Sequence, residues 1–434
     1  MNRYSYQKHW GLWRDRKGNP RTRLEKMMRI HILILLILAA LAMTTAAQPN
    51  PYDYILGDGV SRALYWVDHA MPGALNVLHV PTMPRFPNGV VNGFDNVSLL
   101  YLASTTSAAD PDRLRRWTPA GGGVVANLGI PGLPNAVDID QYADPVISTE
   151  GLNNLRSVSG GAVAVMYGGL PAAVHGFCID GDSGDSIVAT SAGGGSLLRY
   201  PRIAPGAGVA IAAGLGNVTA VAHHPQTGNF VVASRGPGLV RMVTPAGVVM
   251  WTAPFPGASG ARDVKVSPEI GQILACGGQD FRIYSAAGAP LLALAWGGHD
   301  FKCVEEYQTR KVAGRGNSAA GGNYFANFNF PRSPGQVYRG LMSFSMRPGL
   351  PAGGGRTLNL ANDALFAAVN AGALDGSVLA GRLGILDGNG HGVMRITLPA
   401  AMPAGLRLYV SAVAINPAMP GGIDLGNTTG FTTD

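Results

Sequence analysis

The 434-residue chain contains 61 glycines and 30 prolines, and 14% of its residues are charged while 47% are hydrophobic. This composition is typical of many short strands joined by tight turns, and it argues against long helices. The length exceeds the usual size of one domain, so we expect two domains.

The formal net charge of +7 has a local origin. Residues 1–29 contain nine Lys or Arg side chains against Asp15 and Glu25, and the remaining chain holds 24 basic and 24 acidic residues. A neutral body without a basic run lacks the electrostatic footprint of a nucleic-acid-binding protein. We therefore expect no nucleic-acid partner.

The N-terminal segment has the order of a secretory signal. Its basic residues lead into the apolar stretch of residues 30–42, and small residues follow. We predict a signal peptide over residues 1–47, with Met27 or Met28 as a more ordinary start than the first residue. An uncleaved anchor is the alternative, but the apolar run is shorter than the roughly 20 residues that span a bilayer. The prediction is an exported protein (extracellular, periplasmic or at the cell surface) with no membrane span after cleavage.

A repeat of about forty residues follows. Each unit has an opening apolar strand, a turn with Gly or Asp, a second apolar strand, a strand with an embedded Arg, and a fourth apolar strand. The opening residue pairs are Gly93-Phe94, Ala136-Val137, Gly176-Phe177, Ala220-Val221, Asp263-Val264 and Asp300-Phe301. Four strands per forty residues is the pattern of a β-propeller blade, so we predict an all-β chain with a six-bladed β-propeller over residues 48–315.

The two ends of the repeat region complement each other. The N-terminal unit lacks an opening strand, and the opening strand of residues 300–307 has no full unit after it. We expect these ends to pair and close the ring, which removes exposed strand edges. Residues 316–434 show alternating strands without the repeat, and they predict a small β-sandwich-like domain entered through a linker of residues 316–336.

The units of residues 52–312 resemble the blades of secreted NHL-repeat and related six-bladed propellers. The segments RTLNLANDALF, GILDGNGHGVMRITLPA, LRLYVSAVAINPA and NTTGFTTD resemble a C-terminal β-domain that follows propellers in exported bacterial proteins of uncharacterised function. This resemblance implies a fold but no particular activity, because propellers carry unrelated functions.

One polar residue stands directly before each opening pair. These residues are Asn92, Asn135, His175, Thr219, Arg262 and His299. Because opening strands line the central channel of a propeller, we expect them to form a ring around one channel mouth, where they could bind an anion, a sugar-like ligand or, less readily, a metal. The alternative is that these residues are polar only because the channel mouth is exposed to solvent.

Similar six-bladed propellers include metal-dependent gluconolactonases and virginiamycin B lyase, and this general resemblance implies a site at such a mouth. The lactonases bind their ion mainly through carboxylate and amide ligands, but the predicted ring contains no Asp or Glu. The lyases use His with an acidic partner, which His175 and His299 match in kind, with Asp300 adjacent but no clear Glu.

The sequence therefore predicts a secreted, non-enzymatic binding or interaction protein that uses propeller loops and the channel mouth. Its partner is an unknown protein, glycan or small molecule, and we predict no cofactor. The alternative is a lyase or lactonase-type enzyme in which His175, Arg262 and His299 supply acid/base and anion-holding groups. A divalent metal is expected only under that alternative.

The remaining chemically suggestive residues are interpreted as structural. His223 and His224 are neighbours on one strand and point to opposite faces, so they cannot readily share a metal. The acidic stretch of residues 179–185 aligns with blade turns and is not read as a calcium loop. Cys178, Cys276 and Cys303 form no metal-binding spacing and are expected to be buried apolar residues, with a single disulfide as the alternative.

Overall fold

The computed structural model describes residues 49–50, 52–80, 85–93, 95, 98–104, 112–128, 134–149, 152–171, 174–202, 206–257 and 259–434. The predicted signal peptide, including Met27 and Met28, lies outside these residues. Residues 49–434 form one compact unit. Among the helices that the structure describes, none has the length and apolar character needed to cross a membrane.

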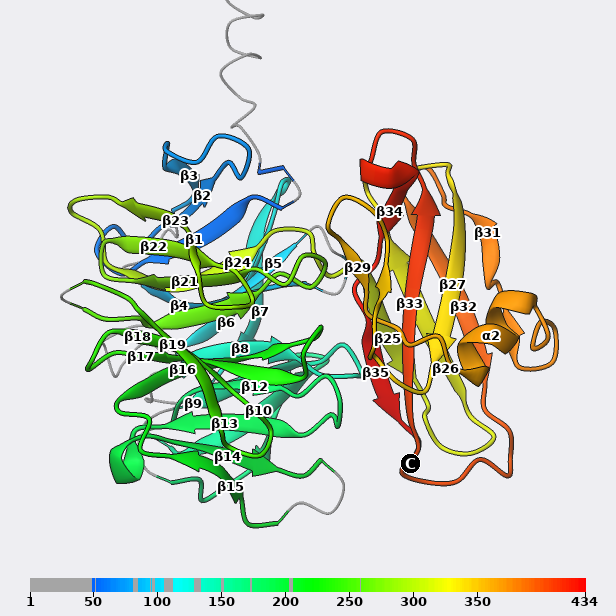
Figure 1. Cartoon of the computed structure of the whole chain (residues 1–434), viewed down its shortest axis with the longest axis horizontal. Coiled ribbons are helices and arrows are strands. Elements are labelled where there is room, and N and C mark those ends of the chain that lie inside the picture. The colour runs from blue at the N-terminus through cyan, green and yellow to red at the C-terminus, as the bar shows by residue number, and fades with distance from the viewer. Residues whose placement is uncertain are drawn as a thin grey trace, which may run out of the picture. The chain divides into compact units, whose positions relative to one another are not determined.

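The first part of the described chain forms six four-stranded antiparallel sheets (Figure 1). Three of them, from the innermost strand outward, are β24 (Phe301–Glu306), β1 (Tyr54–Asp58), β2 (Leu64–Val67) and β3 (Asn76–His79); β4 (Phe86–Asn92), β5 (Leu99–Ser104), β6 (Arg113–Thr118) and β7 (Gly121–Asn127); and β8 (Pro134–Ile139), β9 (Pro145–Thr149), β10 (Asn154–Ser159) and β11 (Ala162–Tyr167). The other three are β12 (Val174–Ile179), β13 (Ser186–Thr190), β14 (Ser196–Tyr200) and β15 (Val209–Ala213); β16 (Val218–His224), β17 (Asn229–Ser234), β18 (Leu239–Val243) and β19 (Val249–Pro254); and β20 (Asp263–Val266), β21 (Ile273–Gly277), β22 (Asp280–Tyr284) and β23 (Pro290–Ala295).

The six sheets form a closed ring. Each innermost strand contacts the innermost strand of the next sheet, in the order β24, β4, β8, β12, β16, β20 and back to β24. The last of these strands in the sequence, β24, pairs with β1, and Glu305 lies opposite Ile55. The predicted propeller fold and the predicted pairing of the two ends are therefore confirmed.

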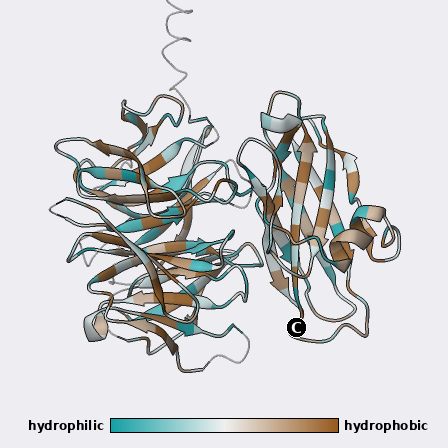
Figure 2. Ribbon diagram, in the orientation of Figure 1, coloured by the Kyte–Doolittle hydropathy of each residue, from teal (hydrophilic) through white to brown (hydrophobic). Residues whose placement is uncertain are grey.

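The propeller core lies between neighbouring sheets, as expected when apolar strands alternate with turns. In one such layer, Val231 and Val240 of one sheet pack with Ile273 and Tyr284 of the next. Figure 2 shows hydrophobic residues along the strands of the propeller sheets. Cys178, Cys276 and Cys303 are free and buried, which agrees with their predicted packing role and excludes the alternative disulfide.

The last part of the chain is a β-sandwich-like domain with two main sheets. One sheet has the order β25 (Val312–Gly316), β26 (Asn323–Asn329), β32 (His391–Thr397) and β30 (Leu379–Ala380). The other has the order β31 (Leu383–Ile385), β27 (Val337–Ser343), β33 (Arg407–Ile415) and β34 (Ile423–Leu425), with β35 (Thr429–Thr432) also paired to β33, and a small pair joins β28 (Leu350–Pro351) and β29 (Thr357–Leu358). Phe328 and Met394 of the first sheet share a buried core with Met342 and Val410 of the second.

Two expectations for this domain differ from the structure. The segment of residues 316–336 was expected as a linker, but it contains β26, which lies inside a sheet and buries Tyr324, Ala326 and Phe328. The first strand of the domain starts at Val312, four residues before the predicted boundary.

A short helix was also not predicted. Helix α2 (Ala364–Ala371) starts where Asp363 accepts a hydrogen bond from the Phe366 amide, and it ends at Gly372, which has a φ of 77°. These are typical start and stop signals of a helix. Two short 3₁₀ turns, η1 (Ala192–Gly194) and η2 (Pro420–Gly422), complete the regular elements of the described chain.

Candidate functional site

Five of the six predicted ring residues lie at the start of inner strands. Asn135, His175 and Thr219 each sit where the register shifts in β8, β12 and β16. Arg262 directly precedes β20, and His299 precedes β24 by one further residue. These five residues therefore lie at equivalent ends of their strands, as the repeat predicts.

The polar groups of this mouth bond within the protein. Their partners include the Asp58 carboxylate for His299 at 2.9 Å, the Asp300 carboxylate for Arg262 at 3.0 Å, the Ser191 hydroxyl for His175 at 3.2 Å, and the Ala261 carbonyl for the Thr219 hydroxyl at 2.8 Å. The His299 ring also stacks on Phe301 with 5.5 Å between ring centroids. These contacts hold the loops and strands of the mouth together.

The predicted place of Asn92 in this ring is wrong. Asn92 is the last residue of β4, whereas the register shift of that strand falls between Pro87 and Val90, so Asn88 takes the ring position. Asn88 donates a hydrogen bond of 3.2 Å to the Pro134 carbonyl of the next sheet. The prediction was wrong because Gly93 and Phe94 resemble the opening pairs of the other units but come after β4 in the chain.

Asn92 instead lies at the opposite end of the channel, beside a small charged cavity. The cavity has a volume of about 210 Å³, and its lining includes Asn92, Asp138, Lys265, Glu305 and Arg310 from the propeller together with Met346, Asn359, Asn427 and Thr428 from the C-terminal domain. Lys265 Nζ lies 3.8 Å from Glu305 Oε2, and Arg310 donates to Asp138 at 3.4 Å. Opposite charges therefore pair around this cavity.

Burial changes the acid–base properties of the cavity. It raises the pKa of Glu305 to about 7, because a charged carboxylate is poorly solvated there. At Lys265, burial lowers the pKa, but the negative charges of Glu305 and Asp138 outweigh burial and raise it. The sequence did not reveal this group, since the charges come from different repeats and meet only when the ring closes.

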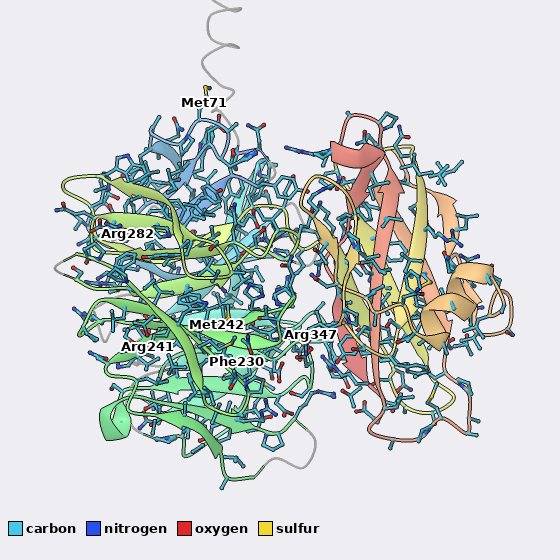
Figure 3. All side chains as sticks on the ribbon, in the orientation of Figure 1. Met71, Phe230, Arg241, Met242, Arg282 and Arg347 are labelled. Atoms are coloured by element: carbon cyan, nitrogen blue, oxygen red, sulfur yellow. The ribbon has the colours of Figure 1, made fainter. Side chains whose placement is uncertain are left out.

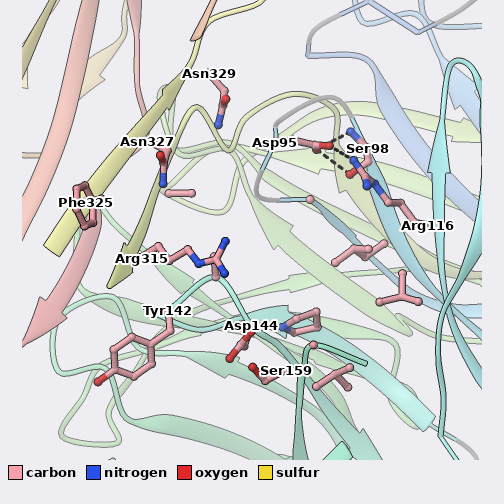
Figure 4. A pocket seen from close by; sticks show the side chains of 18 of the residues that line it. Asp95, Ser98, Arg116, Tyr142, Asp144, Ser159, Arg315, Phe325, Asn327 and Asn329 are labelled. Carbon is pink, nitrogen blue, oxygen red and sulfur yellow. Dashed lines mark hydrogen bonds and ion pairs between the residues drawn. The ribbon is translucent and has the colours of Figure 1, made fainter. Parts of the chain in front are cut away.

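A groove of about 1060 Å³ lies between the propeller and the C-terminal domain (Figure 4). The propeller contributes Gly93, Asp95, Ser98, Leu100, Arg116, Val125, Tyr142, Ala143, Asp144, Pro145, Val158, Ser159, Gly160 and Gly161, and the second domain contributes Ala313, Arg315, Gly316, Phe325, Asn327, Asn329, His391 and Gly392. Pockets at domain interfaces with a few polar groups among apolar side chains are the usual form of ligand sites.

Strand periodicity explains the polar side of this groove. In β26, Tyr324, Ala326 and Phe328 face the core of the domain, so the alternate residues Phe325 and Asn327 face outward into the groove. Arg315 lies opposite Phe325 in the β25–β26 register. Figure 4 shows the side chains of Arg315 and Asn327 in the same groove as Asp144 of the propeller.

The polar side chains of the groove differ from those of the channel mouth in one respect. Within the described part of the chain, the Asp144 carboxylate, the Arg315 guanidinium and the Asn327 carboxamide have no hydrogen-bond or ion-pair partner. At another end of the groove, Arg116 is already paired with Asp95 (Figure 4). The groove thus combines available positive, negative and amide groups.

Sequence reasoning missed this groove entirely. The alternating stretch NYFANFNF contained the signal, since every second residue from Asn323 to Asn329 is polar or exposed once it is read as a strand. A linker prediction for this stretch gives it no outward face, and therefore no side of a groove.

The two adjacent histidines do separate as predicted. His224 is buried, and its Nε2 lies 3.2 Å from the Gly271 carbonyl oxygen, while burial lowers its pKa to about 4. His223 points elsewhere, toward Asp180 and Asp182 of the neighbouring sheet at 3.5 and 3.4 Å. The acidic stretch that holds these carboxylates is a turn between β12 and β13, as predicted.

No family model matches the chain. No curated protein matches it either. Among solved structures, it is similar to a chain in a crystal structure of a nidogen/laminin complex, with 10% sequence identity, coverage of 58% of this chain and 97% of that chain, and a TM-score of 0.49. It is also similar to the WD40 β-propeller domain of Doa1, with 14% identity, coverage of 65% and 92%, and a TM-score of 0.42.

Proposed function

We propose that the protein is an exported, non-enzymatic binding protein, and that the groove between its propeller and its C-terminal domain binds an extended segment of a partner protein. The observation that carries this proposal is the groove of about 1060 Å³ in which Asp144, Arg315 and Asn327 have no partner among the described residues. Arg315 is exposed, and Asp144 and Asn327 are half-buried, so a ligand can replace the water around these polar groups with hydrogen bonds of its own.

The chemistry of the groove suits a polypeptide main chain. The Arg315 guanidinium would donate to carbonyl oxygens, the Asp144 carboxylate would accept from amide N–H groups, and the Asn327 carboxamide can do both. Phe325, which is 39% exposed, offers an apolar ring for a ligand side chain. The volume reaches the upper end of ordinary small-molecule pockets, which favours an extended ligand over a compact one.

The channel mouth supports a catalytic role less well. Arg262 and His299, two of the three groups that an enzyme would use there, are each engaged by a carboxylate, Asp300 and Asp58. A carboxylate can orient a catalytic imidazole, but Asp58 also accepts hydrogen bonds from the Ser61 hydroxyl and from the Asp300 amide, so it connects several segments of the channel mouth and serves a structural role. We therefore favour binding in the groove over chemistry at the mouth.

The test starts from random peptides displayed on phage and selected against the chain without residues 1–47. Affinities of enriched peptides are then measured by calorimetry for the variants Arg315→Ala and Asp144→Asn. Each variant should weaken binding about 10- to 100-fold, because hydrogen bonds to charged groups contribute roughly 1.5–3 kcal/mol.

The matched control is Arg395→Ala. Arg395 is exposed and lies opposite Phe325 on β32, on the same face of the same sheet, but it does not line the groove. Equal losses for Arg315→Ala and Arg395→Ala would contradict the proposal. If Arg262→Ala or His299→Ala abolished peptide binding while the groove variants bound normally, the peptide site would lie at the channel mouth.

A further inference from the structure

Two carboxylates and one imidazole meet at the junction of two neighbouring propeller sheets. Asp180 and Asp182 lie in the turn after β12, and His223 lies near the end of β16 in the next sheet. Ligand-capable atoms of these three side chains all lie within 4.8 Å of one another. His223 Nε2 is 3.5 Å from Asp180 Oδ1 and 3.4 Å from Asp182 Oδ2.

The imidazole nitrogen is not satisfied by these neighbours. Distances of 3.4 and 3.5 Å exceed the 2.7–3.2 Å of good N–H···O hydrogen bonds. The His223 side chain is only 8% exposed, and its Nε2 is buried without a hydrogen-bond partner in the described structure. A buried nitrogen that is aimed between two carboxylates therefore needs a different partner.

A metal ion fits this spacing. In a tetrahedral zinc site, bonds of roughly 2.0–2.2 Å place neighbouring ligand atoms about 3.4 Å apart, which is the separation of His223 Nε2 from both carboxylate oxygens. We infer that Asp180, Asp182 and His223 form a site for a divalent transition-metal ion of the zinc class. An imidazole with two carboxylates is a donor set that such ions accept.

The surroundings supply the other needs of a metal site. His223 and Gly181 both line the cavity of about 210 Å³, so a water molecule has room to occupy the fourth position. The Asp180 carboxylate accepts hydrogen bonds from the Asp182 amide at 3.0 Å and from the Ser183 hydroxyl at 2.8 Å. Such outer contacts orient the oxygens that face the ion.

Arg347 of the C-terminal domain, which is labelled in Figure 3, contacts one of the three proposed ligands. It donates to both oxygens of Asp182, at 2.9 and 2.6 Å. A carboxylate oxygen has two acceptor directions, so Asp182 can bind the ion and Arg347 together. The ion would then join two sheets of the propeller and orient the carboxylate that anchors the second domain.

The experiment uses zinc itself. The chain without residues 1–47 is treated with a chelator, titrated with Zn²⁺, and assayed for bound zinc by mass spectrometry and for affinity by competition. We expect zinc at this site, a Co²⁺ derivative with tetrahedral absorption bands, and a loss of affinity in His223→Ala beyond the roughly 10- to 100-fold that removal of an outer contact causes.

The matched control is His69→Ala. His69 belongs, with Asp53 and Asp68, to the other cluster of the same composition that the described residues contain. Zinc that remains in His223→Ala but disappears in His69→Ala would overturn the inference. The absence of zinc binding by the unmodified chain would overturn it as well.

A folding defect would not leave the question open. If His223→Ala does not fold, the ligands of zinc bound to His69→Ala are identified by X-ray absorption spectroscopy. One imidazole together with oxygen ligands would support the site, whereas sulfur ligands or several imidazoles would contradict it. Binding of peptides in the groove is measured separately, so failure of either proposal leaves the other intact.

Discussion

The substitution Lys311→Met should strongly destabilise the contact between the propeller and the C-terminal domain. Lys311 Nζ lies 2.7 Å from Glu269 in the propeller and 2.7 Å from Asp424 in the C-terminal domain, and all three side chains are at most 3% exposed. The ammonium also donates to the Tyr52 hydroxyl at 2.6 Å. Removing the cation leaves two buried carboxylates near each other.

The size of this effect follows from the surroundings. Removing one partner of a buried ion pair costs about 3–5 kcal/mol, because the remaining charge is uncompensated. Arg356 Nη1 lies 3.5 Å from the second Glu269 oxygen and leaves one cation in place, so we expect a loss of about 3 kcal/mol, at the lower end of that range.

The assay can be made at neutral pH. Burial lowers the pKa of Lys311, but attraction to Glu269, Tyr52 and Asp424 outweighs it, and the net pKa is raised above the ordinary 10.5. A cation whose pKa is raised by folding contributes its full stabilisation below the unfolded pKa and loses it only as the pH rises through the folded value. Urea unfolding followed by tryptophan fluorescence at pH 7 therefore reports the whole contribution.

The control is Lys302→Met. Lys302 Nζ lies 2.6 Å from Asp300, but the two side chains are 23% and 27% exposed, so this pair should contribute less than about 1 kcal/mol. The double change Lys311→Met, Asp424→Asn should recover most of the lost stability, because it removes one uncompensated carboxylate and leaves Glu269 paired with Arg356. A loss in Lys311→Met no larger than that in Lys302→Met would refute the reasoning.

Two further predictions concern the inner strands. Burial raises the pKa of Glu306 to about 8, so the folded state holds this proton more tightly than the unfolded state. Glu306 alone should therefore lower the free energy of unfolding by at most about 1.4 kcal/mol per pH unit as the pH rises from about 4.5 to 8, and Glu305 adds a similar contribution up to about pH 7. Glu306→Gln should flatten this slope in urea unfolding curves, and an unchanged slope would contradict the assignment. A Cβ on Gly176 would lie 2.8 Å from the Thr219 carbonyl oxygen of the next sheet, so Gly176→Ala should cost about 1–3 kcal/mol in thermal unfolding, whereas Gly73→Ala, with no atom within 4 Å, should have little effect. Equal unfolding temperatures for the two glycine variants would disprove this close packing.

The sequence predicted those parts of the fold that the repeat encodes locally. Ala220-Val221 and Asp263-Val264 mark inner strands because each unit has the same order of apolar strands and turns. The stretch FPNGVVNGFDN offered two alignments of an Asn-Gly pair, and only the strand pairing shows that Asn88, not Asn92, has the ring position.

Features that need the second domain could not be predicted. Arg315 and Asp144 are 171 residues apart, and they share a groove only because the two domains are in contact. His223 aligns with the apolar residues Ile139, Ile179 and Val266 of other repeats, which favours a structural role, but alignment within repeats says nothing about the turn that faces His223 from the adjacent sheet.

The closure of the ring through β24 and β1 also has a consequence during synthesis. Strands β1, β2 and β3 emerge early, yet the inner edge of β1 has no partner until β24, about 240 residues later, has been made. For most of the time that the chain grows, it carries an open strand edge that can pair with another chain. A chain that stops before residue 301 should keep that edge permanently, and we expect such fragments to aggregate even though five of the six sheets contain all of their strands.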